Sequence, residues 1–210
     1  MAKENGAGRA RNPRGEGSRL RDEIVGAAVE LLDETGDQGA ITLRSVARHV
    51  GIAAPSIYRH FPDQPAIMLA VVRNAYAELH DELRAAAEAA AGPRQRLLAI
   101  CTTYLEFAPA HPGRYRTMFG GLWVPDLNTS SLTEDDLSTL GRDSMQLITD
   151  AFEDCVNAGE ATSSDVAADA VALWLGLHGL AHQKMAAPSF PWPPDIAERL
   201  ITTLAHFTGE

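Results

Sequence analysis

The sequence predicts an all-α fold, with a small N-terminal domain joined to a larger helical C-terminal domain. Apolar residues recur three and four positions apart along most of the 210 residues, which is the spacing of an amphipathic helix. No stretch alternates convincingly between apolar and polar residues, so we expect no sheet. Glycine, proline and capping residues divide the helical pattern into segments. The chain length suits a small domain fused to a larger one.

The N-terminal domain begins with one helix and continues with two short helices around a glycine. The apolar face of the first helix is formed by Leu20, Ile24, Ala27, Ala28, Leu31 and Leu32. Thr42 can cap the next helix, because its hydroxyl can accept a backbone N–H two or three residues on. The inward face of that helix is formed by Leu43, Val46, Ala47 and Val50. Gly51 follows, at a position where left-handed backbone favours glycine.

The second short helix is predicted to be about two turns long. Pro55 has no N–H to donate and suits a first helical turn, Ile57 and Phe61 face inward together, and Pro62 ends the helix. The side chains off the inward face can form hydrogen bonds; they are Ser56, Tyr58, Arg59 and His60. Two short helices around a glycine turn are the arrangement that holds one helix in the DNA major groove.

The motif at residues 41–61 closely resembles the DNA-binding domain of the TetR family of bacterial transcriptional regulators. The resemblance is carried by Thr42-Leu43-Arg44, Ala47, Gly51-Ile52 and Pro55-Ser56-Ile57-Tyr58-Arg59-His60-Phe61. It implies a helix-turn-helix domain over residues 18–64, preceded by a flexible basic arm at residues 1–17. The DNA-contacting residues that it implies are Thr42, Arg44, Ala54, Pro55, Ser56, Tyr58, Arg59 and His60.

Two positions depart from the pattern of that family. A serine often precedes the recognition helix in the family, whereas Ala53 stands here, so that side-chain cap is missing. The lysine that usually starts the next helix is replaced by Gln64. A neutral amide forms a weaker contact with a phosphate than an ammonium group does. We therefore expect any phosphate contact at Gln64 to be non-ionic.

The charge distribution fits a DNA-binding N-terminal part. The chain carries a formal net charge of −10, and residues 66–210 hold 9 basic against 19 acidic side chains. Residues 1–65 hold 9 of each, and the basic ones gather early in the chain. The acidic part should repel DNA and the basic arm should attract it. A solvated, disordered tail is the other interpretation of the arm; the two are compatible, because a disordered arm can order on DNA.

Residues 65–210 are predicted to form a helical effector-binding and dimerisation domain. Its first three expected helices are residues 64–90 capped by Asp63, a helix that ends before His111, and a short helix at 113–119. A long helix capped by Thr133 and Asp136 follows and ends near Gly159. The last two are a helix at 166–187 capped by Ser163 or Ser164, and a helix with Ile196, Leu200, Leu204 and Phe207 facing inward. A loop covers residues 120–131.

The helix at 166–187 is apolar nearly all round and must therefore be buried on several sides. The family resemblance implies that the last two helices of each subunit form a four-helix dimer interface. The residues assigned to that interface are Leu173, Leu177, Leu180, Leu200 and Leu204. A homodimer also suits a pseudo-palindromic operator, since two recognition helices about 34–36 Å apart meet successive major grooves. A wholly intramolecular core is the alternative.

The segment Trp174 to Gly179 resembles a Trp…His-Gly signature in one TetR subgroup, as do Tyr104 and the run from His111 to Phe119. Aromatic and methionine side chains in this domain could line a cavity for a small, largely apolar effector. The candidates are Tyr104, Phe107, Tyr115, Phe119, Trp123, Met145, Phe152, Trp174 and His178, with Met118 and Met185 as further members. These side chains could equally well fill the core.

Other classes of protein and site find little support in the sequence. His178 and His182 share a helix face, but a metal site needs further ligands, and we expect neither metal nor cofactor. Cys101 and Cys155 lie in apolar helical patterns and are expected to be buried. An enzyme, or a structural dimer with a degenerate DNA domain, is disfavoured by the basic arm and by the intact Arg44, Tyr58 and His60. No signal peptide or clean apolar span is visible, which favours a cytoplasmic repressor that an effector releases from DNA.

Overall fold

The computed structural model describes residues 16–120 and 123–209, and within these ranges it contains helices and no β-strand. The helices are α1 (Glu16–Thr35), the 3-10 turn η1 (Gln38–Ala40), α2 (Leu43–Val50), α3 (Ala54–Ile57), α4 (Gln64–Ala89), α5 (Pro93–Ala110), α6 (Pro112–Phe119), α7 (Glu134–Ser138), α8 (Arg142–Asn157), α9 (Val166–Ala186) and α10 (Ile196–Leu204). The all-α prediction is confirmed. The predicted basic arm lies outside the described residues, except that residues 16 and 17 begin α1.

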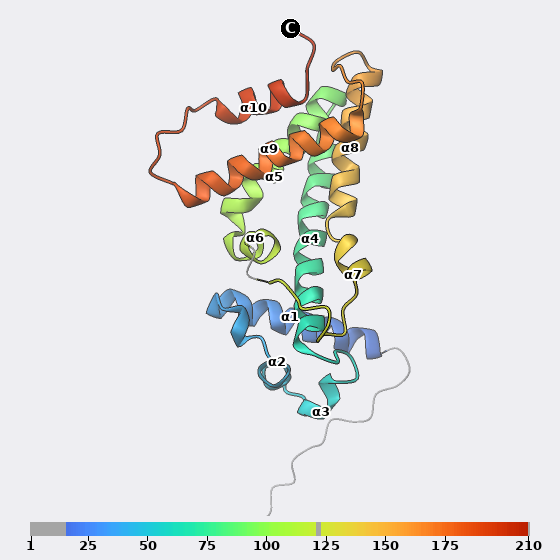
Figure 1. The fold of residues 1–210 in the computed structure, drawn as a ribbon, viewed down its shortest axis with the longest axis vertical. Helices are drawn as coiled ribbons and strands as arrows, with labels where there is room; N and C mark the ends of the chain where they lie inside the picture. Colours follow the sequence, from blue (N-terminus) through green and yellow to red (C-terminus); the bar gives the residue numbers. More distant parts are fainter. Residues whose placement is uncertain (1–15, 121–122, 210) are drawn as a thin grey trace, which may run out of the picture.

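The long helix α4 joins two hydrophobic cores (Figure 1). α1, α2 and α3 gather at its N-terminal end, α5, α6 and α8 pack along the rest of it, and α9 packs on α5 and α8. Ile67 and Val71 of α4 are buried in the N-terminal core, and Leu79 and Leu83 are buried in the C-terminal core. The two cores therefore meet inside α4, beyond the boundary that was predicted at residue 64.

The N-terminal core is built from the apolar faces that the sequence pattern predicted. Ile24 of α1, Ile57 at the end of α3 and Ile41 before α2 are each 0% exposed, and Phe61 is 1% exposed. Fully burying an aliphatic or aromatic side chain contributes about 1.5–3 kcal/mol. These few side chains hold α1 against two short helices, α2 and α3, that would not be stable in isolation.

The C-terminal core is larger and is formed by α4, α5, α8 and α9. Phe107 and Phe152 lie at its centre, fully buried. Cys101 and Cys155 are free and buried, as predicted. Burial raises the pKa of the Cys101 thiol to about 12 and that of Cys155 to about 11, so both are protonated small apolar side chains at neutral pH.

The predicted long helix after Thr133 is wrong, because the chain forms two helices there. Thr133 and Asp136 form a capping box, but the helix that they start is α7, which is only five residues long. Gly141 then adopts a left-handed conformation with φ of 72° and ends the helical path before α8 begins. The ring of Tyr76 lies against Gly141, where a Cβ atom would be 2.8 Å from Cε1. Glycine is therefore required twice over, for its backbone angle and for its lack of a side chain.

The cap of α9 also differs from the prediction. Asp165 accepts the backbone N–H of Ala168 at 3.1 Å, so it caps the helix in place of Ser163 or Ser164. The Ser163 hydroxyl instead donates to the carboxylate of Asp169. Both serine and aspartate are good capping residues, and the pattern of the sequence does not distinguish between adjacent candidates.

We expect Gly141→Ala to destabilise the protein more than Gly159→Ala does. Gly159 has nearly the same φ, 74°, but open space where a Cβ would stand. A left-handed non-glycine residue costs roughly 1–2 kcal/mol, which both variants share. Only the Gly141 variant adds a clash with Tyr76, so its free energy of unfolding in a urea titration should fall by about 1 kcal/mol more. Equal losses would show that Tyr76 moves away freely.

Candidate nucleic-acid interface and effector cavity

The first helix of the motif, α2, is fixed at both ends by local contacts. Thr42 accepts the backbone N–H of Ser45 at 3.1 Å, and the Ser45 hydroxyl oxygen accepts the Thr42 N–H at 2.9 Å. This reciprocal capping box satisfies two helix N-terminal groups. Gly51 ends the helix in a left-handed conformation, with φ of 75°. The turn between the two helices is therefore set by residues that the sequence pattern identified.

The second helix, α3, is shorter than predicted. Regular α-helix covers four residues, and Tyr58, Arg59 and His60 continue as a turn in which the N–H groups of His60 and Phe61 both donate to the Ile57 carbonyl. Ala53 provides no side-chain cap, as the sequence indicated. Pro62 has no N–H to continue the ladder. The buried Ile57 and Phe61 hold this segment against the core, so packing fixes it more than helical hydrogen bonds do.

The eight residues predicted to contact DNA lie on one accessible stretch of the motif. Thr42, Arg44, Pro55, Tyr58 and Arg59 are exposed, and Ala54, Ser56 and His60 are partly exposed. Tyr58 is 52% exposed, and among the described aromatic residues Phe190 is similarly open. Nothing in the N-terminal core requires the exposed cations and phenol. They form a surface with donors for phosphate and base edges.

Helix α1 supports the motif from behind. The guanidinium of Arg21 lies 4.8 Å from the ring centroid of Phe61, a cation–π contact. Glu30 lies 2.9 Å from Nε2 of His49 on α2. These contacts bind α2 and the segment after α3 to a common helix. The accessible surface of the motif therefore moves as one body with α1.

A cavity of about 490 Å³ opens in the C-terminal domain between α4, α5, α6, α8 and α9. Most of its wall is apolar, with Leu79, Ile148 and Val171 among the aliphatic members. Four of the nine predicted effector-contacting residues form part of this wall: Tyr104, Phe119, Met145 and Trp174. The cavity is within the range of sizes that small-molecule sites have in proteins.

The remaining predicted cavity residues have other places. Phe107 and Phe152 are fully buried in the C-terminal core, and Trp123 packs against the N-terminal core. Assigning these three to the cavity was wrong, because spacing along the chain does not separate core-filling from cavity-lining aromatics. Tyr115 lines a separate cavity of about 210 Å³ between α6 and α9, with Met185.

His178 lies at the centre of a polar and aromatic cluster rather than in the wall of the larger cavity. Its Nδ1 atom is 2.9 Å from the Tyr115 hydroxyl and 3.3 Å from the Tyr104 hydroxyl. The ring stacks on Trp174 and contacts Phe119, with centroid distances of 5.7 and 4.7 Å. Burial, and next the charge of His182, lower the pKa of His178. A neutral His178 whose Nδ1 accepts a phenol links α5, α6 and α9.

Sequence analysis missed several polar residues beside the larger cavity. Tyr76 and His80 from α4 approach Arg142 and Ser144 from α8 around a second cavity of about 320 Å³. The two cavities share Tyr76, Arg142 and Ser144 in their walls. None of these residues was singled out by its sequence pattern. A signal that could have indicated this place is Gly141, where α4 closely approaches the start of α8.

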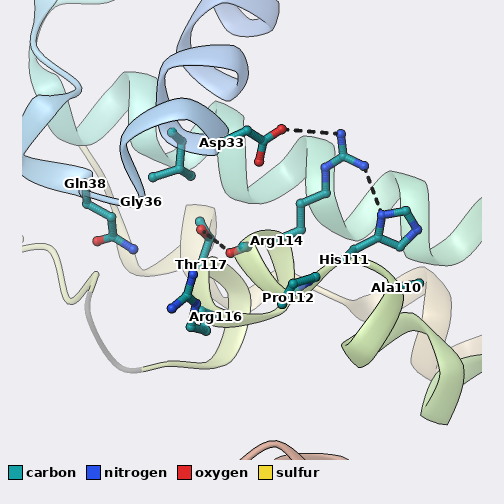
Figure 2. Close-up of a pocket in the computed structure, with 11 residues that line it drawn as sticks. Asp33, Gly36, Gln38, Ala110, His111, Pro112, Arg114, Arg116 and Thr117 are labelled. Carbon is teal, nitrogen blue, oxygen red and sulfur yellow. Dashed lines mark hydrogen bonds and ion pairs between the residues drawn. The ribbon is translucent and has the colours of Figure 1, made fainter.

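A network of ion pairs joins α6 to α1 and α4. Figure 2 shows the contacts of Arg114 with Asp33 and His111. Arg114 of α6 lies 2.6 Å from Glu78 of α4 and 3.9 Å from Asp33 of α1. His111 lies 3.1 Å from Glu82 and 3.4 Å from Arg114. A neutral His111 can donate to Glu82 through Nε2 and accept from Arg114 through Nδ1. These contacts border a polar cavity of about 400 Å³ at the junction of the two domains.

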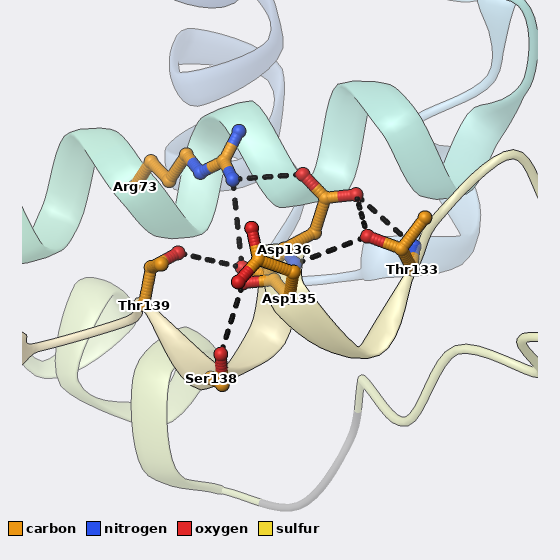
Figure 3. Close-up of polar contacts among 6 residues, drawn as sticks. All are labelled: Arg73, Thr133, Asp135, Asp136, Ser138 and Thr139. Atoms are coloured by element: carbon orange, nitrogen blue, oxygen red, sulfur yellow. Dashed lines mark hydrogen bonds and ion pairs between the residues drawn. The ribbon is translucent and has the colours of Figure 1, made fainter.

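A second polar contact joins α7 to α4 (Figure 3). Arg73 of α4 lies 2.9 Å from Asp136, whose other carboxylate oxygen accepts from Thr133 in the capping box. These hydrogen bonds lower the pKa of Asp136. Nearer the start of α4, Asp63 caps that helix and also accepts the backbone N–H of Ser131 at 2.7 Å. α4 is therefore tied to the neighbouring helices on two sides.

The residues assigned to a dimer interface are mostly inside the chain's own core. Leu173 and Leu177 are 0% exposed and Leu180 is 6% exposed. Leu200 and Leu204 of α10 pack on α9 at Gly176, where a Cβ would be 2.4 Å from a Leu204 methyl carbon. The opposite face of α9 is open and carries Val171 and Leu175, which are 43% and 55% exposed. An interface on this helix must therefore use the open face.

No group of three or more histidine, cysteine, aspartate or glutamate side chains in the described part of the chain is placed to hold a metal ion. No helix in the same ranges is long and apolar enough to span a membrane.

We predict that the stability of the protein falls as the pH drops from 7.5 to 5.5, partly through His178. The folded-state pKa of His178 lies below its ordinary value of 6.5. The unfolded chain therefore binds a proton first, and the stabilisation present above pH 6.5 is lost as the pH falls. Solvent screens this half-buried ring, so we expect the contribution to be at most about 1 kcal/mol.

Urea titrations at both pH values test this for the protein and for His178→Asn, whose amide oxygen can still accept the Tyr115 hydroxyl. The variant should lose less stability on acidification. His206→Asn changes an exposed histidine at positive φ, which asparagine tolerates, and serves as the control. An unchanged pH dependence in His178→Asn would exclude His178 as its source.

Comparison with protein families gives a match for each domain. Residues 24–71 match the family model described as bacterial regulatory proteins, tetR family. Residues 97–207 match the model described as tetracyclin repressor-like, C-terminal domain. The second match covers more than half of the chain. Neither description names the Trp…His-Gly subgroup, so that resemblance stays a prediction.

Individual relatives agree with these matches. The chain is 32% identical over 94 residues to the HTH-type transcriptional regulator BetI of Rhizobium meliloti, a match that covers 42% of this chain and 45% of BetI. The chain spans about half the length of the curated relatives it matches.

Solved structures share the fold over nearly the whole chain. A Rhodococcus sp. RHA1 protein of unknown function is 24% identical with a TM-score of 0.70, covering 93% of this chain and 95% of its own. The regulator FadR of Bacillus subtilis in complex with stearoyl-CoA is 12% identical with a TM-score of 0.68, covering 88% and 97%. At these identities the likeness concerns the fold alone. Both domains match models of a family of transcriptional regulators, which are not enzymes. The chain is a member of the TetR family of transcriptional regulators, with a helix-turn-helix DNA-binding domain.

Proposed function

We propose that this TetR-family member is a homodimeric repressor that leaves a pseudo-palindromic operator when a small, largely apolar effector binds. The observation that carries the proposal is the exposed set Arg44, Tyr58 and Arg59 on a motif that is held in the core by its buried Val46, Ile57 and Phe61. Arginine and tyrosine are the side chains that read base edges and hold phosphates.

In this proposal Arg44, Ser56 and Arg59 read base edges, and Thr42, Tyr58 and His60 hold phosphates. Thr42 can do so while it caps α2, because its hydroxyl oxygen accepts the Ser45 N–H and its proton can turn from the Ser45 hydroxyl, 2.9 Å away, to a phosphate oxygen. The start of α4 offers N–H groups beside Gln64, although the Asp63 carboxylate already takes one of them. Neutral contacts of this kind position the motif without an ionic bond.

Effector binding would act on the motif through α4. Tyr76 and Leu79 of α4 and Phe119 of α6 belong to the wall of the larger cavity. A ligand that displaces α6 also displaces Arg114, which is paired with Asp33 on α1 and Glu78 on α4. Because α1 moves with the motif, the spacing of the two recognition segments in a dimer would change. Couplings of this kind are typically about 1–3 kcal/mol.

Two names among the similar proteins support this choice. BetI is named as an HTH-type transcriptional regulator, and FadR of Bacillus subtilis was solved with stearoyl-CoA, a ligand with a long apolar chain. The larger cavity of this protein has the apolar wall that such a chain requires. Selection of binding sites from random DNA would identify the operator and its half-site spacing.

We expect Arg44→Ala to weaken binding to the selected operator by roughly 1–3 kcal/mol, because a base contact would be lost. Electrophoretic mobility shifts at fixed salt measure the change. Arg84→Ala removes an equally exposed arginine from α4, where it pairs with Glu88 at 2.8 Å far from the motif. This control should bind like the parent. If both variants retain full affinity, Arg44 does not belong to the DNA-reading set.

We expect Leu175→Glu to convert the dimer to a monomer of 22.6 kDa in sedimentation velocity. Leu175 is 55% exposed on the open face of α9, and an interface that covers it would have to bury the new charge. Val124→Glu places the same charge at an 81% exposed apolar residue outside α9 and should remain dimeric. A Leu175→Glu protein that stays fully dimeric would place the interface elsewhere.

A further inference from the structure

Two buried polar atoms next to the larger cavity have no hydrogen-bond partner in the part of the chain that the structure describes. They are the hydroxyl oxygen of Ser144 on α8 and Nδ1 of His80 on α4. Ser144 is only 7% exposed and lines both the larger cavity and the adjoining cavity of about 320 Å³, which His80 also lines. Leaving such a group buried and unpaired destabilises the protein. A ligand group placed between α4 and α8 would remove that cost.

The same place is the N-terminus of α8. Gly141 precedes the helix and provides no side-chain cap for its first N–H groups. The N-terminus of a 16-residue helix carries a partial positive charge and binds anions readily. The helix end and the unpaired Ser144 hydroxyl, which are independent observations, both indicate a group that accepts hydrogen bonds.

Some of the charged side chains around this helix end are already in ion pairs, and others are not. Arg73 and Asp81, which line the smaller cavity, are already paired with Asp136 and Arg84. Arg142 lines both cavities and makes no ion pair within the described ranges. The exposed Asp143 is the remaining carboxylate of the smaller cavity. A ligand at this end would meet more hydrogen-bond donors than acceptors. The donors are Arg142, Ser144, His80 and the N–H groups of the first turn of α8.

The larger cavity continues from these donors into apolar surroundings. Its wall includes Leu79, Tyr104, Phe119, Met145, Ile148 and Trp174. A molecule that fills both regions must therefore be apolar over most of its length and carry an acceptor at one end. A carboxylate is the acceptor that can use a hydroxyl, an imidazole N–H and a guanidinium at the same time.

We propose that the effector is an apolar carboxylic acid whose carboxylate binds Ser144, His80 and Arg142 at the start of α8, with its apolar body in the larger cavity. The inference rests on the proposed role of this cavity as the effector site. The bound carboxylate would bridge α4 and α8 beside Gly141, the joint between α7 and α8. It would therefore act on α4, which is joined to α7 by the Arg73–Asp136 ion pair.

Isothermal titration calorimetry of the full-length protein at pH 7.5 tests the proposal with two acids and their matching alcohols. The probes are decanoate with 1-decanol and 2-naphthoate with 2-naphthalenemethanol. We expect at least one acid to bind about 10-fold more tightly than its alcohol, the effect of losing a hydrogen bond to a charged group. Ser144→Ala and Arg142→Gln should each reduce this preference to less than about 3-fold.

Ser138→Ala is the matched control, because Ser138 of α7 also lines the larger cavity but its hydroxyl already donates to the Asp135 carbonyl at 3.2 Å. It should keep the full preference for the acid. Arg142 is exposed, so its variant is expected to fold even if Ser144→Ala does not. Equal binding of acid and alcohol, a preference that survives both substitutions, or no binding of either acid at millimolar concentration would overturn the proposal.

A parallel mobility-shift assay with operator DNA separates this inference from the proposed function. An acid that binds with the expected preference but leaves the protein on DNA would reject release by the effector and leave the carboxylate site standing. An uncharged compound that releases the protein from DNA, while both acids fail to bind, would reject the carboxylate site and leave the proposed function standing.

Discussion

The burial of one helix in two cores is the constraint on which the rest of this structure depends. Ile67, Met68 and Val71 of α4 lie in the N-terminal core, and Leu79 and Leu83 lie in the C-terminal core. Protein interiors are close-packed, so a helix anchored in this way moves as a rigid body or not at all. In the proposed function, a change in the C-terminal wall of α4 would therefore reach the N-terminal core, where Ile67 and Val71 pack with side chains of the motif.

The polar contacts along α4 have a different role from the apolar ones. Arg73–Asp136 and Arg114–Glu78 are partly exposed ion pairs, and such pairs contribute about 0–1 kcal/mol each to stability. Their main effect is on the arrangement of the helices, because each pair joins α4 to one particular neighbour, α7 or α6. The apolar cores thus supply most of the stability, and the ion pairs connect α4 to α7 and to α6 at defined points.

The candidate DNA-binding surface was largely predictable because its determinants are local. Backbone angles and hydrogen bonds within a few residues explain the roles of Thr42, Gly51 and Pro55. The spacing of Ile57 and Phe61 predicts the buried face. The cavity was less predictable. Tyr104 and Trp174 reach its wall, whereas Phe107 and Phe152 fill the core, although all four are aromatic residues in helical apolar patterns. His80 and Ser144 gave no signal, because neither is distinctive until α4 packs on α8.

The sequence by itself determined the helices, most of their caps, the glycine turn of the motif and the resemblance to the family. These features depend on spacing and on interactions within a few residues, which a chain carries along its length. Only the tertiary structure decided that Gly141 divides the predicted long helix and that Leu173 and Leu177 face the chain's own core while Leu175 lies open. When a helix is apolar all round, its sequence pattern does not predict which of its faces the rest of the same chain will cover. That choice is made by contacts between residues far apart in the sequence.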